Sequence, residues 1–183
     1  MKLLGISRIT PGLATVNDIQ REVVPDGKGF LHSLYTSLKP DYPKFFKMDL
    51  HCKLGFLATE LLLEGTEGRF EPREDRAVVA FTHNGCLQND LEFNAGCKAE
   101  NYFPSPALFV YTLPNIVTGE ICIRNRYKGD SSCFVLPNPD REKIQECLEC
   151  VFQDPVTTSA LCTWVDYKSE EDYEAYAFLI ENK

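Results

Sequence analysis

The chain has 183 residues, of which 44% are hydrophobic, so it is long enough to bury a core and has the usual size of one domain. Its 27 Asp and Glu residues outnumber its 19 Lys and Arg residues, and a net charge of −8 disfavours binding to nucleic acid or anionic lipid, since both would repel the chain. No window approaches the roughly 18 apolar residues of a membrane span, and the segment MKLLGISRIT lacks the long apolar run and the cleavage site of a signal peptide. We therefore expect a single domain, residues 1–183, in the cytoplasm, with neither nucleic acid nor membrane as partner.

The first quarter of the chain predicts one strand followed by a long irregular segment. Residues 1–13 are typical of a short strand that ends near Pro11-Gly12. Residues 18–43 contain turn signals such as Pro25-Asp26-Gly27 and are expected to be irregular. Aromatic residues in and just after this segment indicate that it packs against the rest of the chain: Phe30, Tyr35, Phe45 and Phe46.

The segment from Met48 to Leu63 predicts the clearest helix. Its apolar positions recur at helical spacing, and Gly65 ends the run. We expect Asp49 and His51, at the start of this helix, to be a capping residue and a surface residue.

The segment from Arg76 to Thr82 is an almost continuous apolar run followed by His83-Asn84-Gly85. Such a run is typical of a strand that is buried on both faces, as in a parallel sheet. Residues 103–115 contain three prolines and are expected to form a loop or the approach to a helix.

A helix is predicted from Asn115 to Tyr127, with Ile116, Gly119, Ile123 and also Cys122 facing inward. Glycine in the middle of a helix is unfavourable by about 1 kcal/mol relative to alanine. We therefore expect another element to approach closely at Gly119.

The last third of the chain predicts a strand, a helix and two further strands. Ser132–Leu136 is expected to be a short strand, and Asp140 to cap a helix over Arg141–Phe152. Ser159–Asp166 and Tyr173–Ile180 are expected to pair as a β-hairpin around a charged turn. The order of elements predicts a layered α/β fold with a mixed, mainly parallel sheet and helices on its faces.

The chain contains eight cysteines: Cys52, Cys86, Cys97, Cys122, Cys133, Cys147, Cys150 and Cys162. Without a signal peptide, we interpret them as reduced thiols that serve as small buried apolar residues. Cys147 and Cys150 have the spacing of metal ligands, but a zinc site needs two more ligands and no second pair lies nearby. The three histidines, His32, His51 and His83, are isolated and lie well upstream. No metal or cofactor is expected.

Several short segments, taken in order, resemble the N-terminal half of the β-ketoacyl (3-oxoacyl-ACP) synthases. Pro106–Asn115 is similar to a proline-bounded segment of that family, Val117–Arg124 to the helix after it, and Tyr127-Lys-Gly129 to the turn that follows. Met48-Asp49 and the segment Val78–Gly85 fit upstream, and Trp164-Val-Asp166 fits where the family has a closing strand. The resemblance spans about Met48 to Asp166 and implies a thiolase-like fold.

The resemblance also implies that the family's chemistry is absent. The family's nucleophilic cysteine lies on a strand-to-helix turn a few residues after the glycine that Gly129 matches, and Asn138 falls at that position. Pro137 and Pro139 replace small residues, and Asp140 adds a negative charge where an oxyanion would form. The family's two catalytic histidines lie in a C-terminal half that has no counterpart here, and no histidine follows His83. We expect no catalytic residue.

Two alternatives for a nucleophile stay open. Cys133 lies five residues before Asn138 in an expected strand, and Cys86 and His83 flank Gly85 after another strand. A thiol needs a nearby base and exposure to its substrate, and neither pattern supplies a third, orienting group.

Two hypotheses about function follow. The first is a catalytically inactive β-ketoacyl-synthase-like subunit that takes part in synthesis of the fatty-acid or polyketide type. It would form a homodimer or bind a full-length ketosynthase, and an acyl carrier protein would be a further partner. The second is a small enzyme that acts on acyl thioesters through Cys133, or through Cys86 with His83.

Overall fold

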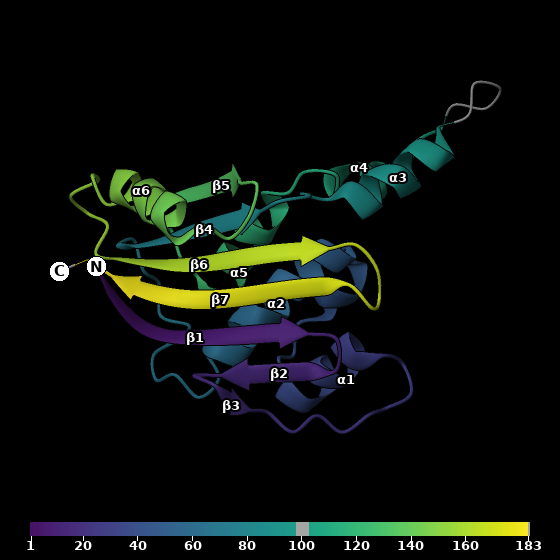
Figure 1. Ribbon diagram of the computed structural model, residues 1–183, viewed down its shortest axis with the longest axis horizontal. Helices are drawn as coiled ribbons and strands as arrows, with labels where there is room; N and C mark the ends of the chain where they lie inside the picture. The colour runs from purple at the N-terminus through teal and green to yellow at the C-terminus, as the bar shows by residue number, and fades with distance from the viewer. Residues whose placement is uncertain (98–102, 183) are drawn as a thin grey trace.

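The computed structural model describes residues 1–97 and 103–182. Within them, seven strands form one sheet in the order β3-β2-β1-β7-β6-β4-β5 (Figure 1). The strands are β1 (Lys2–Thr10), β2 (Leu13–Val16), β3 (Ile19–Gln20), β4 (Arg76–Thr82), β5 (Ser131–Val135), β6 (Ser159–Tyr167) and β7 (Tyr173–Glu181). The two chain ends lie together, because Lys2 of β1 pairs with Glu181 of β7.

The α/β class and the mixed sheet are confirmed, but the expectation of mainly parallel pairing is wrong. Strand β4 is parallel to β5 and β6, with Val79 opposite Ser132 and Cys162. The other four pairings, β6–β7, β7–β1, β1–β2 and β2–β3, are antiparallel. The reason is that short turns join β1 to β2 and β6 to β7, and a short turn can only connect antiparallel neighbours.

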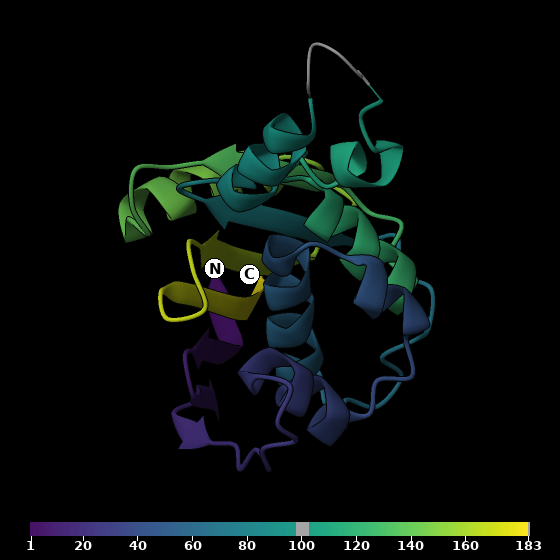
Figure 2. The same cartoon turned by 90° about the vertical axis from the view of Figure 1, so that its right-hand side faces the viewer.

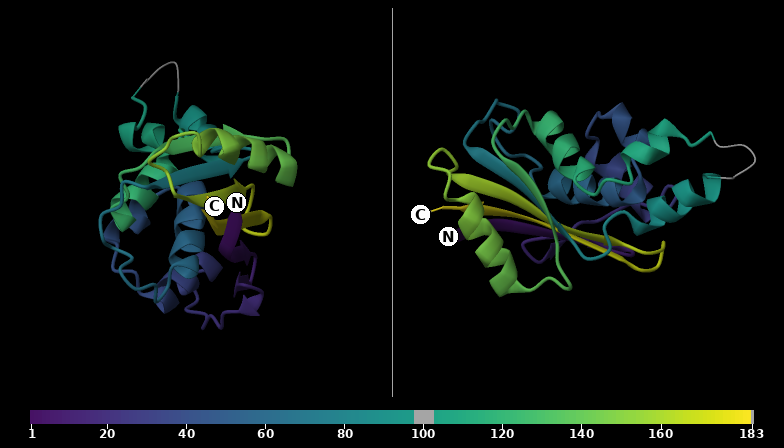
Figure 3. Two further views of the ribbon diagram at one scale, coloured as in Figure 1. Left: turned by 90° about the vertical axis from the view of Figure 1, so that its left-hand side faces the viewer. Right: turned by 90° about the horizontal axis from the view of Figure 1, so that it is seen from above.

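Helices cover both faces of the sheet (Figures 2 and 3). They are α1 (Phe30–Leu38), α2 (Leu50–Leu62), α3 (Leu87–Gly96), α4 (Pro106–Val110), α5 (Ile116–Asn125) and α6 (Arg141–Val151), with a 3₁₀ turn η1 (Pro43–Lys47). Helices α1, α2 and α5 lie on one face and α6 on the other, and α3 and α4 extend beyond the end of β4. In the described part of the chain, no helix is both long and apolar enough to cross a membrane.

Some elements agree with the sequence prediction, and others do not. Helices α2, α5 and α6, strands β4 and β5 and the β6–β7 hairpin are confirmed. Residues 18–43 were expected to be irregular but contain β3 and α1, while β2 and α3 were not predicted and α4 occupies the expected loop 103–115. Helix α3 has few apolar residues at helical spacing, so its sequence carries little periodicity.

The inward face of α5 was assigned only partly correctly. Ile116 and Cys122 pack against the core as expected, and Val117 and Ile121 are buried. Ile123 is 63% exposed, and a methyl group at Gly119 would meet no described atom within 4 Å. Helices α2 and α5 approach closely at Gly55 of α2, where an added Cβ would lie 2.6 Å from Cγ2 of Val117.

Candidate functional site

Polar groups gather where β4 and β6 end side by side. Asp166, near the end of β6, accepts hydrogen bonds from the backbone N–H groups of His83 (2.9 Å) and Asn84 (3.0 Å) and from the hydroxyl of Thr82 (3.1 Å). The Thr82 hydroxyl in turn accepts from the backbone N–H of Gly85 at 2.9 Å. One carboxylate therefore fixes the loop after β4, at the edge where parallel strands of α/β proteins commonly present ligand-binding groups.

His83 and Cys86 lie in this loop but have separate surroundings. The His83 ring is exposed, and its Nδ1 lies 3.2 Å from the carbonyl oxygen of Leu136. Cys86 is buried, and desolvation raises the pKa of its thiol well above the ordinary value. Among the described residues, no hydrogen bond joins these two side chains. A thiol in this environment is a poor nucleophile at neutral pH.

The other cysteines are free thiols that differ in exposure. All eight are free thiols, and Cys52, Cys86 and Cys162 are buried, whereas Cys150 is exposed, contrary to the expectation that all serve as core residues. Cys133 is half-buried in β5, and burial raises its pKa. Over residues 1–97 and 103–182, no three His, Cys, Asp or Glu side chains gather as a metal site would require.

The turn between β5 and α6 carries Asn138, which the sequence resemblance aligns with the family's nucleophile. Asn138 is exposed, as are Pro137 and Pro139 beside it. Asp140 caps α6: its Oδ1 accepts hydrogen bonds from the backbone N–H groups of Glu142 (2.8 Å) and Lys143 (3.1 Å). A carboxylate therefore occupies the helix N-terminus that would otherwise be free to stabilise a negative charge.

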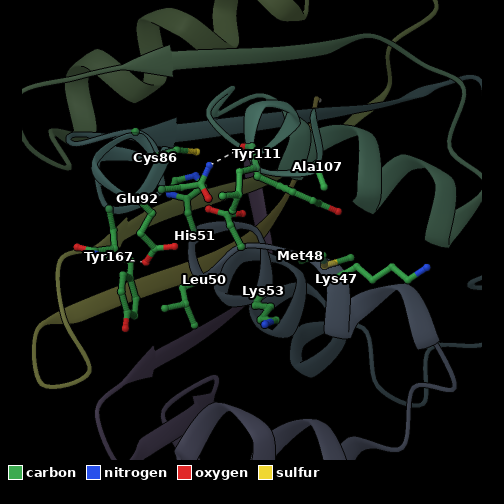
Figure 4. A pocket seen from close by; sticks show the side chains of 15 residues that line it. Lys47, Met48, Leu50, His51, Lys53, Cys86, Glu92, Ala107, Tyr111 and Tyr167 are labelled. Carbon is green, nitrogen blue, oxygen red and sulfur yellow. Dashed lines mark hydrogen bonds between the residues drawn. The ribbon is translucent and has the colours of Figure 1, made fainter. Parts of the chain in front are cut away.

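A cavity of about 260 Å³ lies at the start of α2, between α2 and the extension formed by α3 and α4 (Figure 4). In that view the side chains of His51, Leu50, Tyr111 and Glu92 surround a common space, while Lys47 extends away from it. Cavities with a few convergent polar groups are the usual place for small-molecule ligands.

The expectation that His51 lies at the surface is wrong, since only 4% of the residue is exposed. Desolvation lowers the pKa of His51 to about 4, against a smaller opposing effect of the Asp166 charge. Among residues 1–97 and 103–182, its Nδ1 finds no hydrogen-bond partner. The sequence contained a signal for its burial, because His51 lies three and seven positions before Leu54 and Ala58 and so shares their helix face.

Asp49 caps α2 as expected. Its carboxylate accepts a hydrogen bond from the backbone N–H of Cys52 at 3.0 Å. Desolvation is the largest influence on this carboxyl group and raises its pKa to about 6. The cavity is thus lined by a histidine whose burial favours the neutral ring and by a carboxyl group with a raised pKa, two features that were not predicted from the sequence.

Comparison with known proteins identifies the fold. No protein-family model matches the sequence, and no curated protein matches it. The ishigamide ketosynthase/chain length factor is similar, with a TM-score of 0.70 and 15% identity over 98% of this chain and 61% of that chain. The ketosynthase ApeO in complex with its chain length factor ApeC, from Xenorhabdus doucetiae, has a TM-score of 0.64 and 12% identity over 99% of this chain and 79% of that chain. A β-ketoacyl synthase from Burkholderia phymatum STM815 has a TM-score of 0.55 and 12% identity over 98% of this chain and 58% of that chain.

The class that these matches define is the ketosynthase-like, thiolase-like fold, and the resemblance seen in the sequence is confirmed at the level of fold. The chain spans less than two thirds of the length of two of these three structures, at 61% and 58%.

Proposed function

We propose that this chain is a ketosynthase-like subunit that does not carry out the cysteine-dependent condensation itself and that works bound to a ketosynthase. Residues 1–183 act as one domain in the cytoplasm, in synthesis of the fatty-acid or polyketide type, with an acyl carrier protein delivering the chains. A homodimer is the other form of assembly that fits this role.

The observation that carries the proposal is the turn at Asn138. A condensing thiol must sit at an open helix N-terminus, where the amides stabilise the thiolate and the oxyanion that forms during acyl transfer. Here an amide side chain takes the place of the thiol, and Asp140 holds the amides of Glu142 and Lys143. The negative charge of Asp140 opposes a second negative charge at the same point.

Two exposed apolar surfaces support association with a partner. The first is the α3–α4 extension, where Leu91 and Phe109 are 56% and 53% exposed. The second is β5, an edge strand of the sheet that carries Val135, which is 65% exposed. Apolar patches and unpaired strand edges are typical of protein interfaces. The neighbouring structures include a ketosynthase in complex with its chain length factor.

A reconstituted condensation reaction tests the role. A ketosynthase from the same genome is assayed with malonyl- and acyl-loaded carrier protein, with and without this chain, and the product lengths are read by mass spectrometry. We expect no product from this chain with carrier protein alone, and a changed product length or a longer-lived ketosynthase when both are present. Condensation by the chain alone would overturn the proposal, as would identical products and lifetimes in the two reactions.

The alternative, an acyl-thioester enzyme that uses Cys133 or Cys86 with His83, makes a different prediction. Such an enzyme would form a covalent adduct with an acyl thioester at one cysteine. Burial raises the pKa of both thiols, which weighs against this alternative.

A further inference from the structure

A second cavity, of about 320 Å³, lies next to the one at the start of α2. The side chains of Leu50, Lys53 and Tyr167 line both cavities, so the two adjoin at these residues. Aromatic rings dominate the walls of the second cavity, among them Phe45 and Phe46, whose centroids lie 5.5 Å apart. An apolar cavity of about 150 Å³ already suffices to bind benzene. The two cavities are thus neighbours, the first lined by polar side chains such as His51 and Glu92 and the second by Phe45 and Phe46.

The first cavity contains a group that needs a partner. His51 lines this cavity and is 4% exposed, and its Nδ1 makes no hydrogen bond to any residue that the structure describes. An unsatisfied buried polar atom is unfavourable by about 1–3 kcal/mol. A neutral imidazole carries one donor and one acceptor nitrogen, so a hydroxyl or carbonyl oxygen that enters the cavity can bond to the ring.

Charges of both signs line the two cavities. Asp49, Glu92, Lys47 and Lys53 line the first, and Glu170, Lys28 and Lys53 line the second, so three carboxylates and three lysines line the two together. A fully charged ligand would lie near a like charge at any position, and the free-energy cost of its desolvation would not be offset. The two cavities therefore favour a neutral molecule.

We propose that the joined cavities around Leu50 bind an elongated, neutral, largely apolar molecule that carries a hydroxyl or carbonyl oxygen, with this oxygen at His51 and the apolar chain along Phe45 and Phe46. This goes beyond the proposed function, since it assigns a ligand site to the chain itself and does not depend on association with a ketosynthase.

Straight-chain alcohols from butanol to decanol are suitable probes, titrated into the full chain by calorimetry. We expect affinity to rise with chain length and 1-octanol to bind at least about 10-fold more tightly than octanoate, whose charge the site disfavours.

Substitutions at Leu50 test the place where the two cavities adjoin. Leu50→Trp fills this place and should weaken the binding of 1-octanol at least about 10-fold, whereas Leu50→Ala widens it and should leave decanol bound as tightly or more tightly. His51→Phe keeps an aromatic ring but removes the two nitrogens that can form hydrogen bonds, and it should weaken the binding of 1-octanol about 2- to 10-fold.

Val156→Trp is the matched control, because Val156 is exposed and lines neither cavity. Circular dichroism establishes that each variant is folded. Absence of binding to the unsubstituted chain would overturn the proposal, and so would equal affinity for octanoate or equal 1-octanol binding by folded Leu50→Trp and Val156→Trp. None of these results bears on complex formation with a ketosynthase, so the two proposals can fail separately.

Discussion

Oδ1 of Asp140 lies 2.8 Å from the backbone nitrogen of Glu142, so a carboxylate fills the N-terminus of α6. The same atom accepts from the backbone N–H of Lys143 at 3.1 Å. The residue thus stabilises the helix, and under the proposed function its charge also disfavours a thiolate or an oxyanion at this turn.

The capping role predicts a defined loss of stability. Asp140→Ala removes the acceptor for both amides and should lower the free energy of unfolding by about 1 kcal/mol. Asp140→Asn keeps an acceptor oxygen and is the control, for which we expect little change. Urea unfolding monitored by circular dichroism measures both variants. Equal stability of Asp140→Ala and the unsubstituted chain would contradict the capping role.

Gly55 and Gly119, both in helices, should respond in opposite directions to substitution by alanine. A Cβ at Gly55 would lie 2.6 Å from Cγ2 of Val117 and 3.0 Å from Cγ2 of Val165, so Gly55→Ala should destabilise the fold by about 1–3 kcal/mol. A Cβ at Gly119 meets nothing within 4 Å, so Gly119→Ala should stabilise it by about 0.5–1 kcal/mol through the better helix propensity of alanine. Thermal and urea unfolding measure the stability of both variants. A change in the free energy of unfolding of the same sign for both would refute the assigned helix packing.

A buried ion cluster joins α2 to the end of α5. Glu60 is 4% exposed and pairs with Arg69 and, at 3.1 Å, with Nε of Arg124. Glu60→Gln leaves two cations without a counter-charge and should lower the free energy of unfolding by about 3 kcal/mol. Glu146→Gln, which breaks an exposed pair with Lys143, is the control and should change little. The prediction fails if the two variants unfold at the same urea concentration.

The cavity residues His51 and Asp49 should give opposite pH dependences. The pKa of His51 falls to about 4 on folding, so between about pH 6.5 and pH 4 the unfolded chain binds more protons, and this residue lowers stability as the pH falls. The pKa of Asp49 rises to about 6, so between about pH 6 and pH 4 the folded chain binds more protons, and this residue raises stability as the pH falls.

Substitution separates the two effects. On going from pH 7 to pH 5, His51→Gln should retain about 2 kcal/mol more of its stability than the unsubstituted chain, whereas Asp49→Asn should lose about 1 kcal/mol more. Urea unfolding at the two pH values tests both changes. Parallel pH profiles for all three proteins would show that neither group has the altered pKa.

Alkylation tests the cysteines directly. Iodoacetamide at neutral pH should label exposed Cys150 first, and buried Cys52, Cys86 and Cys162 only after denaturation, because burial keeps these thiols protonated and inaccessible. Mass spectrometry of peptides locates the label. Selective labelling of Cys86 or Cys133 in the folded protein would instead favour the acyl-thioester enzyme.

The parts of the fold that were predicted from the sequence are those that local chemistry determines. The apolar run Arg76–Thr82 is buried along its whole length and is the strand expected, and Asp140 marks the start of α6. Strand β2 and helix α1 were missed because short elements depend on tertiary packing more than on periodicity. His51 was placed at the surface because of its polarity, although its spacing matches the buried face of α2. The Asp166–His83 hydrogen bond joins residues 83 positions apart, so only the fold brings them together.

The central claim is association with a ketosynthase, and native mass spectrometry of the two proteins purified after co-expression from one genome tests it most directly. The account predicts a species whose mass equals that of the ketosynthase plus 20.8 kDa for each copy of this chain, with no acyl adduct on this chain after incubation with an acyl thioester. Separate masses for the two proteins, with this chain a 20.8 kDa monomer at micromolar concentration, would contradict it.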